Sequence, residues 1–246
     1  MLTEIGHVEA IFRYPVKSMA GEDLQEARVT YAGLSGDRVY AFIDSKFGPP
    51  DFPWMTGRQG HDLILFRPRF LNAPPIEDEI PDPDRFATEV TTLEGEKFRM
   101  GDPRFTEYLE QRFKRSLRLR FSERSMTDAR PVSIFSSATI RALSEEAGLN
   151  LDARRFRANC YVEWKNDAPF FEDTLVGREL QLGELVALQV VKKDERCIMI
   201  TLDPESAVSA PPVLARISKN HDGCAGVYAA VLREGIVRVN DPIYLI

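Results

Sequence analysis

The sequence lacks a long hydrophobic run and a secretory signal. No stretch approaches the roughly 18 consecutive apolar residues that a membrane span requires. The N-terminal segment has no basic region followed by an apolar one, so no signal peptide is predicted. The only cysteines, Cys160, Cys197 and Cys224, are odd in number and widely spaced, which excludes a disulfide framework and indicates a reducing compartment. We expect a cytoplasmic protein without a membrane partner.

The chain also lacks an excess of positive charge and the common catalytic motifs. Its formal net charge of −6 and pI near 5.3 argue against a nucleic-acid partner. The sequence contains no GxGxxG, GxxxxGK[ST] or GxSxG motif, and no CxxC. Its three histidines, His7, His61 and His221, are scattered. A metal site built from protein ligands alone is therefore poorly supported, and a transition metal would have to bring most of its own ligands.

What the sequence does contain is many short segments rich in β-branched and aromatic residues. Strands are predicted at residues 8–14, 27–31, 38–43, 63–66, 160–164, 180–182, 186–191, 198–202, 227–232 and 236–239. Residues 89–100 predict a hairpin, and residues 179–188 and 235–245 each predict a strand that doubles back. Helices are expected from Pro103 and over residues 136–149, and surface loops at 48–53 and 74–84. Many strands with few helices favour a mainly β (α+β) protein built on a β-barrel.

Cys197 is the clearest candidate for a reactive or metal-binding residue. It follows Arg196 directly, and a neighbouring cation favours the thiolate, which is both the nucleophilic and the metal-ligating form. Residues 198–202 predict an apolar strand after it. Three interpretations stay open on local chemistry: a buried structural cysteine, a metal ligand, or a thiol hydrolase that pairs Cys197 with His221.

A family resemblance bears on this choice. The segment RCIMITLDPES at 196–206 resembles the RC-x-x-TT-x-DP-x-T motif of the MOSC family, the molybdenum cofactor sulfurase C-terminal domain. Further matches lie in collinear order along almost the whole chain: YPVKS at 14–18, GDR with VYAFID at 36–44, TGRQ at 56–59, FRAN at 156–159, FED at 171–173, GVY at 226–228 and NDPIYL at 240–245. The layout is most similar to that of amidoxime-reducing components and their bacterial relatives. The resemblance implies a MOSC-type β-barrel with flanking helices at residues 119–246 and a smaller N-terminal β-rich domain at residues 1–118.

The resemblance also implies a molybdenum cofactor (molybdopterin) and its ligands. Cys197 takes the position of the catalytic metal ligand, where a soft thiolate suits the metal. The positions that contact the pterin and its phosphate are Lys17, Ser18, Arg38, Arg130, Arg157, Asn159, Arg196 and Tyr228. Cations among them suit the phosphate, and amide or hydroxyl groups suit the ring edges. The domain type also allows pyridoxal phosphate binding.

Three positions depart from the family pattern. Asp194 stands where many relatives have a second cysteine, and Ile200–Thr201 stands where relatives often have two threonines. Ala129–Arg130 replaces small hydroxyl residues of close relatives, so Arg130 either adds a phosphate contact or marks a different pocket wall. The substrate side is therefore the least transferable part.

The function that the resemblance implies is reduction of an N-hydroxylated or similar N-oxygenated small molecule. Electrons would come from a separate ferredoxin- or flavodoxin-like protein. The basic run at residues 112–124 either docks such an acidic partner or is a solvated face. The alternative function is a non-catalytic module that carries the cofactor or its sulfur.

Overall fold

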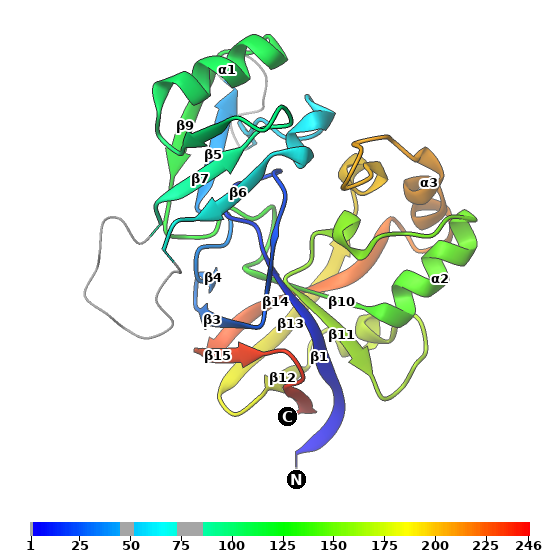
Figure 1. Ribbon diagram of the computed structural model, residues 1–246. Coiled ribbons are helices and arrows are strands. Elements are labelled where there is room, and N and C mark those ends of the chain that lie inside the picture. The colour runs from blue at the N-terminus through cyan, green and yellow to red at the C-terminus, as the bar shows by residue number, and fades with distance from the viewer. Residues whose placement is uncertain (1, 45–51, 73–85) are drawn as a thin grey trace.

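The computed structural model describes residues 2–44, 52–72 and 86–246 (Figure 1). Seven strands close into a ring, in which each strand pairs with the next and the last with the first. In order around the ring they are β1 (Thr3–Arg13), β11 (Cys160–Trp164), β10 (Val132–Ser136), β14 (Cys224–Arg233), β13 (Val186–Glu195), β12 (Glu179–Leu182) and β16 (Pro242–Leu245). The short strand β2 (Glu22–Leu24) pairs with β1 outside the ring. The expected mainly β fold with a β-barrel is confirmed.

The interior of the barrel is packed with aliphatic side chains. Ile11, Ile134, Leu180 and Val190 are fully buried there, and Trp164 is the largest ring among them. Neighbouring strands are antiparallel except β10 and β11, which run parallel. Parallel neighbours need a crossover connection, and helix α2 (Ser137–Ala147) lies on that connection.

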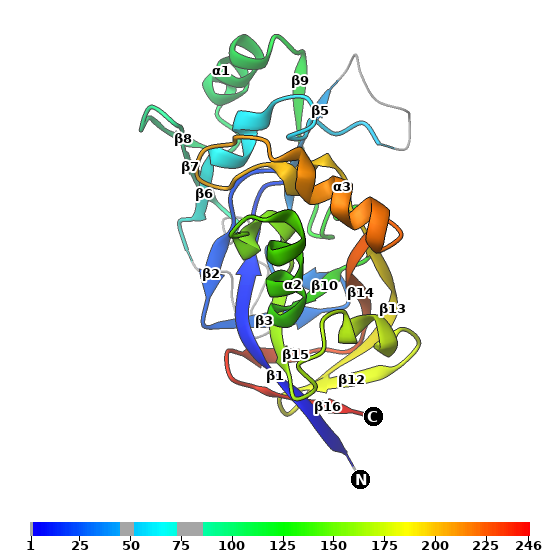
Figure 2. The same cartoon turned by 90° about the vertical axis from the view of Figure 1, so that its right-hand side faces the viewer.

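A second unit, formed by residues of the N-terminal half, lies at the end of the barrel away from both termini (Figures 1 and 2). Strand β5 (Tyr40–Asp44) pairs with β9 (Leu117–Phe121), and β6 (Arg67–Phe70), β7 (Thr88–Thr91) and β8 (Lys97–Arg99) form a small antiparallel sheet. Helix α1 (Pro103–Phe113) covers these strands over an aromatic core. Because β1 belongs to the ring that residues 132–245 complete, the division of the chain at residue 118 stays a prediction.

A fourth sheet joins a segment from the N-terminal part of the chain to one from the C-terminal part. It pairs β3 (Glu26–Thr30) with β4 (Gly33–Leu34) on one side and with β15 (Gly235–Arg238) on the other. Beside the barrel, α2 packs against α3 (Pro211–Asn220) over a cluster that includes Phe135 and Phe156. Helix α2 begins as its sequence predicts, because the Ser136 hydroxyl accepts a hydrogen bond from the amide of Thr139.

Several sequence predictions were wrong in detail. The expected strands at residues 63–66 and 198–202 are instead 3₁₀ helices, η1 (His61–Leu65) and η4 (Ile198–Thr201). Helix α3 was not predicted. Residues 235–245 do not form a hairpin, since β15 pairs with β3 while β16 pairs with β1 and β12. The predicted loop at 74–84, and residues 48–51 of the other, lie outside the described residues.

Candidate cofactor pocket

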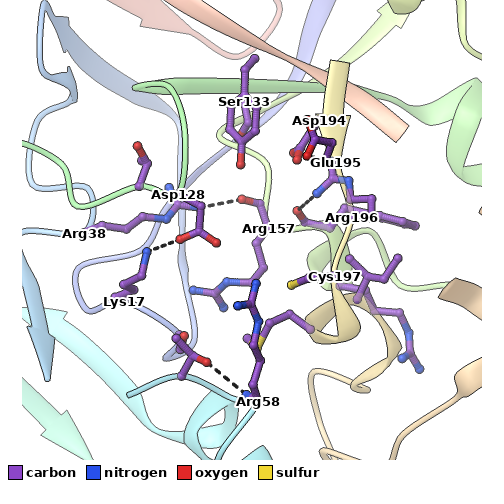
Figure 3. A pocket seen from close by; sticks show the side chains of 18 of the residues that line it. Lys17, Arg38, Arg58, Asp128, Ser133, Arg157, Asp194, Glu195, Arg196 and Cys197 are labelled. Atoms are coloured by element: carbon purple, nitrogen blue, oxygen red, sulfur yellow. Dashed lines mark hydrogen bonds and ion pairs between the residues drawn. The ribbon is translucent and has the colours of Figure 1, made fainter. Parts of the chain in front are cut away.

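A pocket lies where the barrel meets the N-terminal unit, and Cys197 is in its wall (Figure 3). Seven of the nine residues singled out in the sequence line this one pocket: Lys17, Ser18, Arg38, Arg157, Arg196, Cys197 and Tyr228. They come from the turn after β1, the approach to β5, the turns that flank η2 (Ala153–Phe156) and η4, and strand β14. Residues distant in sequence therefore converge on one site.

Cys197 is held at a sharp change of direction. Strand β13 ends at Glu195, and Cys197 is the extended residue that precedes the 3₁₀ turn η4. Arg155 fixes this turn because its guanidinium donates to the carbonyl of Thr201 at 2.7 Å and pairs with Asp203 at 2.8 Å. Cys197 is partly exposed and free of any disulfide, and its sulfur points into the pocket (Figure 3). The interpretation of Cys197 as a buried structural cysteine is not supported.

Backbone conformation at the pocket is unusual. Ser18, Arg38 and Arg157 all have positive φ angles, of 66°, 49° and 54°. Residues other than glycine adopt this left-handed region rarely and at an energetic cost, and such residues cluster at functional sites. All three line the pocket, which indicates that the chain is folded to hold these side chains in place.

Most of the cations in the pocket already have oxygen partners. Lys17 donates to the carbonyl of Met126 at 2.8 Å and pairs with Asp128. Arg38 pairs with the buried Asp37 and donates to the carbonyl of Arg157 at 2.9 Å. This Arg38–Asp37 pair is buried rather than exposed to solvent.

Arg196 is held by several oxygen atoms of the chain. Its guanidinium donates to the carbonyl oxygens of Ala225 at 2.7 Å and Phe156 at 2.9 Å, and it pairs with Asp194 at 2.8 Å. The ring of Phe135 lies 5.1 Å from the guanidinium carbon. Because the chain itself satisfies this side chain, Arg196 fixes the strand end next to Cys197.

Arg157 is different, because its guanidinium has no oxygen partner among the described residues. It lies over the ring of Tyr14, 4.3 Å from the centroid, and its Nη2 atom is buried without a hydrogen bond. Burial lowers the pKa of Arg157 to about 10. A buried donor without a partner is costly, so this atom points to an anionic or polar ligand that the chain does not supply.

Two acid groups complete the inner wall. Asp194 is 3% exposed, and burial, opposed by the attraction of Arg196, raises the pKa of its carboxyl to about 6. Burial and the nearby Asp194 raise the pKa of the Tyr228 hydroxyl. The departure from the family pattern at position 194 therefore places an ionisable group in the pocket.

Sequence reasoning missed Arg58 as a site residue, although the TGRQ segment had been noted. Arg58 lines the pocket from the N-terminal unit and is close enough to the Cys197 sulfur to interact with it electrostatically. The signal lay in that segment, where the side chain of Gln59 accepts hydrogen bonds from the amide and hydroxyl of Thr56 and so shapes the turn.

Two predicted residues are not in the pocket lining. Asn159 is buried behind it, where its amide oxygen accepts from the amide of Ser133 at 3.2 Å and its nitrogen donates to the carbonyl of Phe12. Asn159 thus supports Ser133, which does line the pocket. Arg130 lies exposed in a neighbouring loop and is absent from the lining. The ligand roles of both stay predictions.

His221 does not pair with Cys197. Its imidazole contacts Glu146 at 2.8 Å and stacks on Phe170 at 4.0 Å, and His221 is not among the residues that line the pocket. The thiol hydrolase interpretation therefore loses its base. Within the described residues, no group of three or more His, Cys, Asp or Glu side chains is arranged to hold a metal ion. No helix in that part of the chain is long and apolar enough to cross a membrane.

The basic run at residues 112–124 is partly neutralised by the N-terminal unit itself. Arg112 pairs with Asp62 at 2.6 Å and Glu94 at 3.0 Å, and Arg115 pairs with Asp44 at 3.3 Å. Partner docking by this run stays a prediction.

Comparison with known families agrees with this geometry. Residues 122–244 match the model of the MOSC domain, and residues 5–105 match that of the MOSC N-terminal beta barrel domain. The chain belongs to the MOSC family. It is 26% identical to mitochondrial amidoxime reducing component 2 of Bos taurus, over 99% of this chain and 84% of that protein. It is 24% identical to mitochondrial amidoxime-reducing component 1 of Mus musculus, over 100% of this chain and 84% of that protein.

A solved structure shares the fold of this MOSC protein. The YUAD protein from Bacillus subtilis superimposes with a TM-score of 0.52 at 15% sequence identity, covering 100% of this chain and 98% of that chain. At this identity the likeness concerns the fold alone.

Proposed function

We propose that this protein binds a molybdenum cofactor through Cys197 and reduces a small N-oxygenated compound. Membership of the MOSC family and similarity to amidoxime reducing components support a role associated with this cofactor. The observation that carries the proposal is the position of Cys197. Its sulfur faces a pocket that also holds the unpartnered buried guanidinium of Arg157.

The residues present suit a pterin cofactor that ends in a phosphate. A single thiolate ligand is sufficient for a metal whose other ligands belong to the cofactor, and thiolate is a soft donor. Arg157 would bind the phosphate, because it is the buried cation without an oxygen partner. Ser18 and Tyr228 would bind polar edges of the pterin, and Lys17 would contribute charge once Asp128 moves aside.

The small volume of the pocket means that side chains must move before the cofactor can bind. The cavity measures about 90 Å³, which is too narrow for a whole pterin. A second cavity of about 620 Å³ lies next to it, and Arg155, Arg157 and Met199 border both. Because Arg157 and Met199 are long and flexible side chains, their movement would join the two spaces.

The chemistry divides between cofactor and chain. A bound molybdenum cofactor supplies a two-electron redox centre, and conversion of an N–OH group to N–H with release of water consumes two electrons and two protons. Asp194, with a pKa of about 6, can take up and release a proton in the pocket close to neutral pH. The electrons would come from a separate ferredoxin- or flavodoxin-like protein.

The test compares two cysteine variants purified from a host that makes the cofactor. Cys197→Ser is expected to lose the molybdenum of the wild-type protein and the turnover of benzamidoxime with an artificial electron donor. Cys224→Ser is the matched control, because Cys224 is also free and partly exposed but lies outside the pocket. Elemental analysis measures the metal.

Equal molybdenum in wild type and Cys197→Ser would contradict the proposal. Stoichiometric molybdenum without turnover of any N-oxygenated compound would instead support the carrier function.

A further inference from the structure

The pocket contains two guanidinium groups without an oxygen partner among the described residues, and they lie at different depths. Six cations line it: Lys17, Arg38, Arg58, Arg155, Arg157 and Arg196. Four of them bind carboxylates and backbone carbonyls of the chain itself. The exceptions are Arg157, whose Nη2 atom is buried, and Arg58, which is exposed. In the proposed function, Arg157 binds the phosphate of the cofactor, whereas Arg58 has no ligand.

Arg58 lies at the solvent side of Cys197. Figure 3 shows its side chain rising from the N-terminal unit toward the Cys197 sulfur. Its guanidinium is close enough to that sulfur to interact with it electrostatically, and the ring of Phe52 lies 4.9 Å from the guanidinium carbon. Asp128 is near enough to act on it electrostatically but is itself paired with Lys17. The group is thus available to an anion that approaches Cys197 from solvent.

The turn that carries Arg58 is rigidly placed. Gly57 packs against the residues that follow Cys197, and a Cβ atom there would come within 2.6 Å of the Met199 sulfur. On the other side of the turn, the carboxamide oxygen of Gln59 accepts from the amide of Thr56 at 2.9 Å and from its hydroxyl at 2.8 Å. A side chain on such a turn is pre-organised, which reduces the entropy lost when it binds a ligand.

We propose that Arg58 is a specificity-determining residue that selects N-oxygenated substrates carrying a carboxylate, a proposal that rests on the proposed function. A planar guanidinium offers two parallel donors that match a carboxylate, and charge-assisted bonds of this kind are about twice as strong as neutral ones. The adjacent Phe52 ring provides an apolar surface for the body of an aromatic substrate. The N-terminal unit would in this way choose the substrate, while the barrel holds the metal ligand.

The test measures binding without turnover. Oxidised, cofactor-loaded protein is titrated with benzamidoxime and with 4-carboxybenzamidoxime by calorimetry, in the absence of an electron donor. Wild type is expected to bind the carboxylated compound about tenfold more tightly. Arg58→Met should reduce this ratio to about one. Arg58→Lys should keep about a threefold preference, because lysine retains the charge but not the planar pair of donors.

Arg99→Met is the matched control, since Arg99 is an exposed arginine of the same unit without a partner among the described residues and lies outside both cavities. It should keep the tenfold ratio. With an artificial donor, Arg58→Met should raise KM for the carboxylated compound and leave kcat within about twofold.

Three results would overturn the proposal. They are a wild-type ratio near one, an unchanged ratio in Arg58→Met, and a loss of molybdenum in Arg58→Met, which would assign Arg58 to the cofactor instead. Failure of the proposed function is separate, because a wild-type protein without molybdenum is recognised by elemental analysis before any titration.

Discussion

The barrel and the N-terminal unit are built from different kinds of side chain. The barrel interior is mainly Val, Ile and Leu, which suit a closed ring of strands that alternate inward and outward residues. The N-terminal core is dominated by Phe42, Phe66 and Phe105, with Phe98 and Tyr108 at its border. Its strands are too few to close on themselves, so α1 and large rings cover them. The same chain thus uses strand closure in one region and aromatic packing in the other.

The two regions also treat the pocket differently. On the barrel side, Arg196 is fixed by three backbone or carboxylate oxygens. On the N-terminal side, Lys17 depends on Asp128, whose side chain is 46% exposed, and Arg58 has only a ring and a sulfur beside it. We infer that Arg196 and its oxygen partners form the fixed wall of the pocket, and that the guanidinium of Arg58, on its rigid turn, is left available to a ligand.

The largest expected effect comes from a substitution in the aromatic core of the N-terminal unit. Phe105→Ala should lower the free energy of unfolding of the N-terminal unit by about 4 kcal/mol, because Phe105 is 1% exposed and packs on Phe42 and Phe98. Urea unfolding followed by fluorescence can separate the regions, since Trp54 lies beside β5 and Trp164 lies in the barrel. The Trp54 transition should shift more than the Trp164 transition.

A Trp54→Phe background leaves Trp164 as the single reporter of the barrel. If both transitions shift equally, the two cores unfold as one unit and the comparison fails.

A smaller effect, dependent on pH, tests the fixed wall. The folded pKa of Asp194 is about 6, above the ordinary value of 3.8, so folding takes up a proton between these values. Wild type should therefore gain about 1 kcal/mol of stability relative to Asp194→Asn as the pH falls from 7 to 5. Urea denaturation of both proteins at pH 7, 6 and 5 measures this difference. A flat or opposite trend would show that Asp194 titrates normally.

The smallest effect concerns an ion pair that joins the two regions. Glu205, on the barrel side, pairs with Arg67 of β6 at 3.1 Å and with Arg154 at 2.6 Å. These side chains are exposed, so Glu205→Gln should cost less than about 1 kcal/mol of stability, and less still at high salt. Glu89→Gln, which breaks a pair with Lys97 inside the N-terminal unit, is the control. A cost of several kcal/mol for Glu205 alone would identify this pair as the main junction.

Local sequence patterns were sufficient to predict most strands and the capped helices. Cys160–Trp164 forms the predicted strand within its predicted bounds, and α2, capped by Ser136 and Gly148, lies within the predicted range 136–149. The runs at 63–66 and 198–202 failed because a short apolar run does not distinguish a strand from another buried segment. Helix α3 did have a signal, with Pro211 in its first turn and Val213 and Ile217 one turn apart.

Only the pocket residues that belong to the family motifs could be predicted from the sequence. The family pattern brought Lys17, Arg38 and Cys197 together, but it could not show that Arg58 lies near the same sulfur, since Arg58 and Cys197 belong to different regions of the fold. Nor could it show that Asn159 lies behind the wall, because burial of a polar side chain depends on its neighbours. Which arginine lacks a partner is likewise decided by packing.

Strand β1 has a consequence for how the protein is made. It pairs on one edge with β11 and on the other with β16, so residues 3–13 must wait for residues 242–245 before the ring can close. The ribosome synthesises β1 early and β16 late, and contacts between residues so distant in sequence form slowly. Throughout that interval an edge of β1 is open to unwanted partners. In a nascent chain, the ring therefore cannot close before β16 has been synthesised.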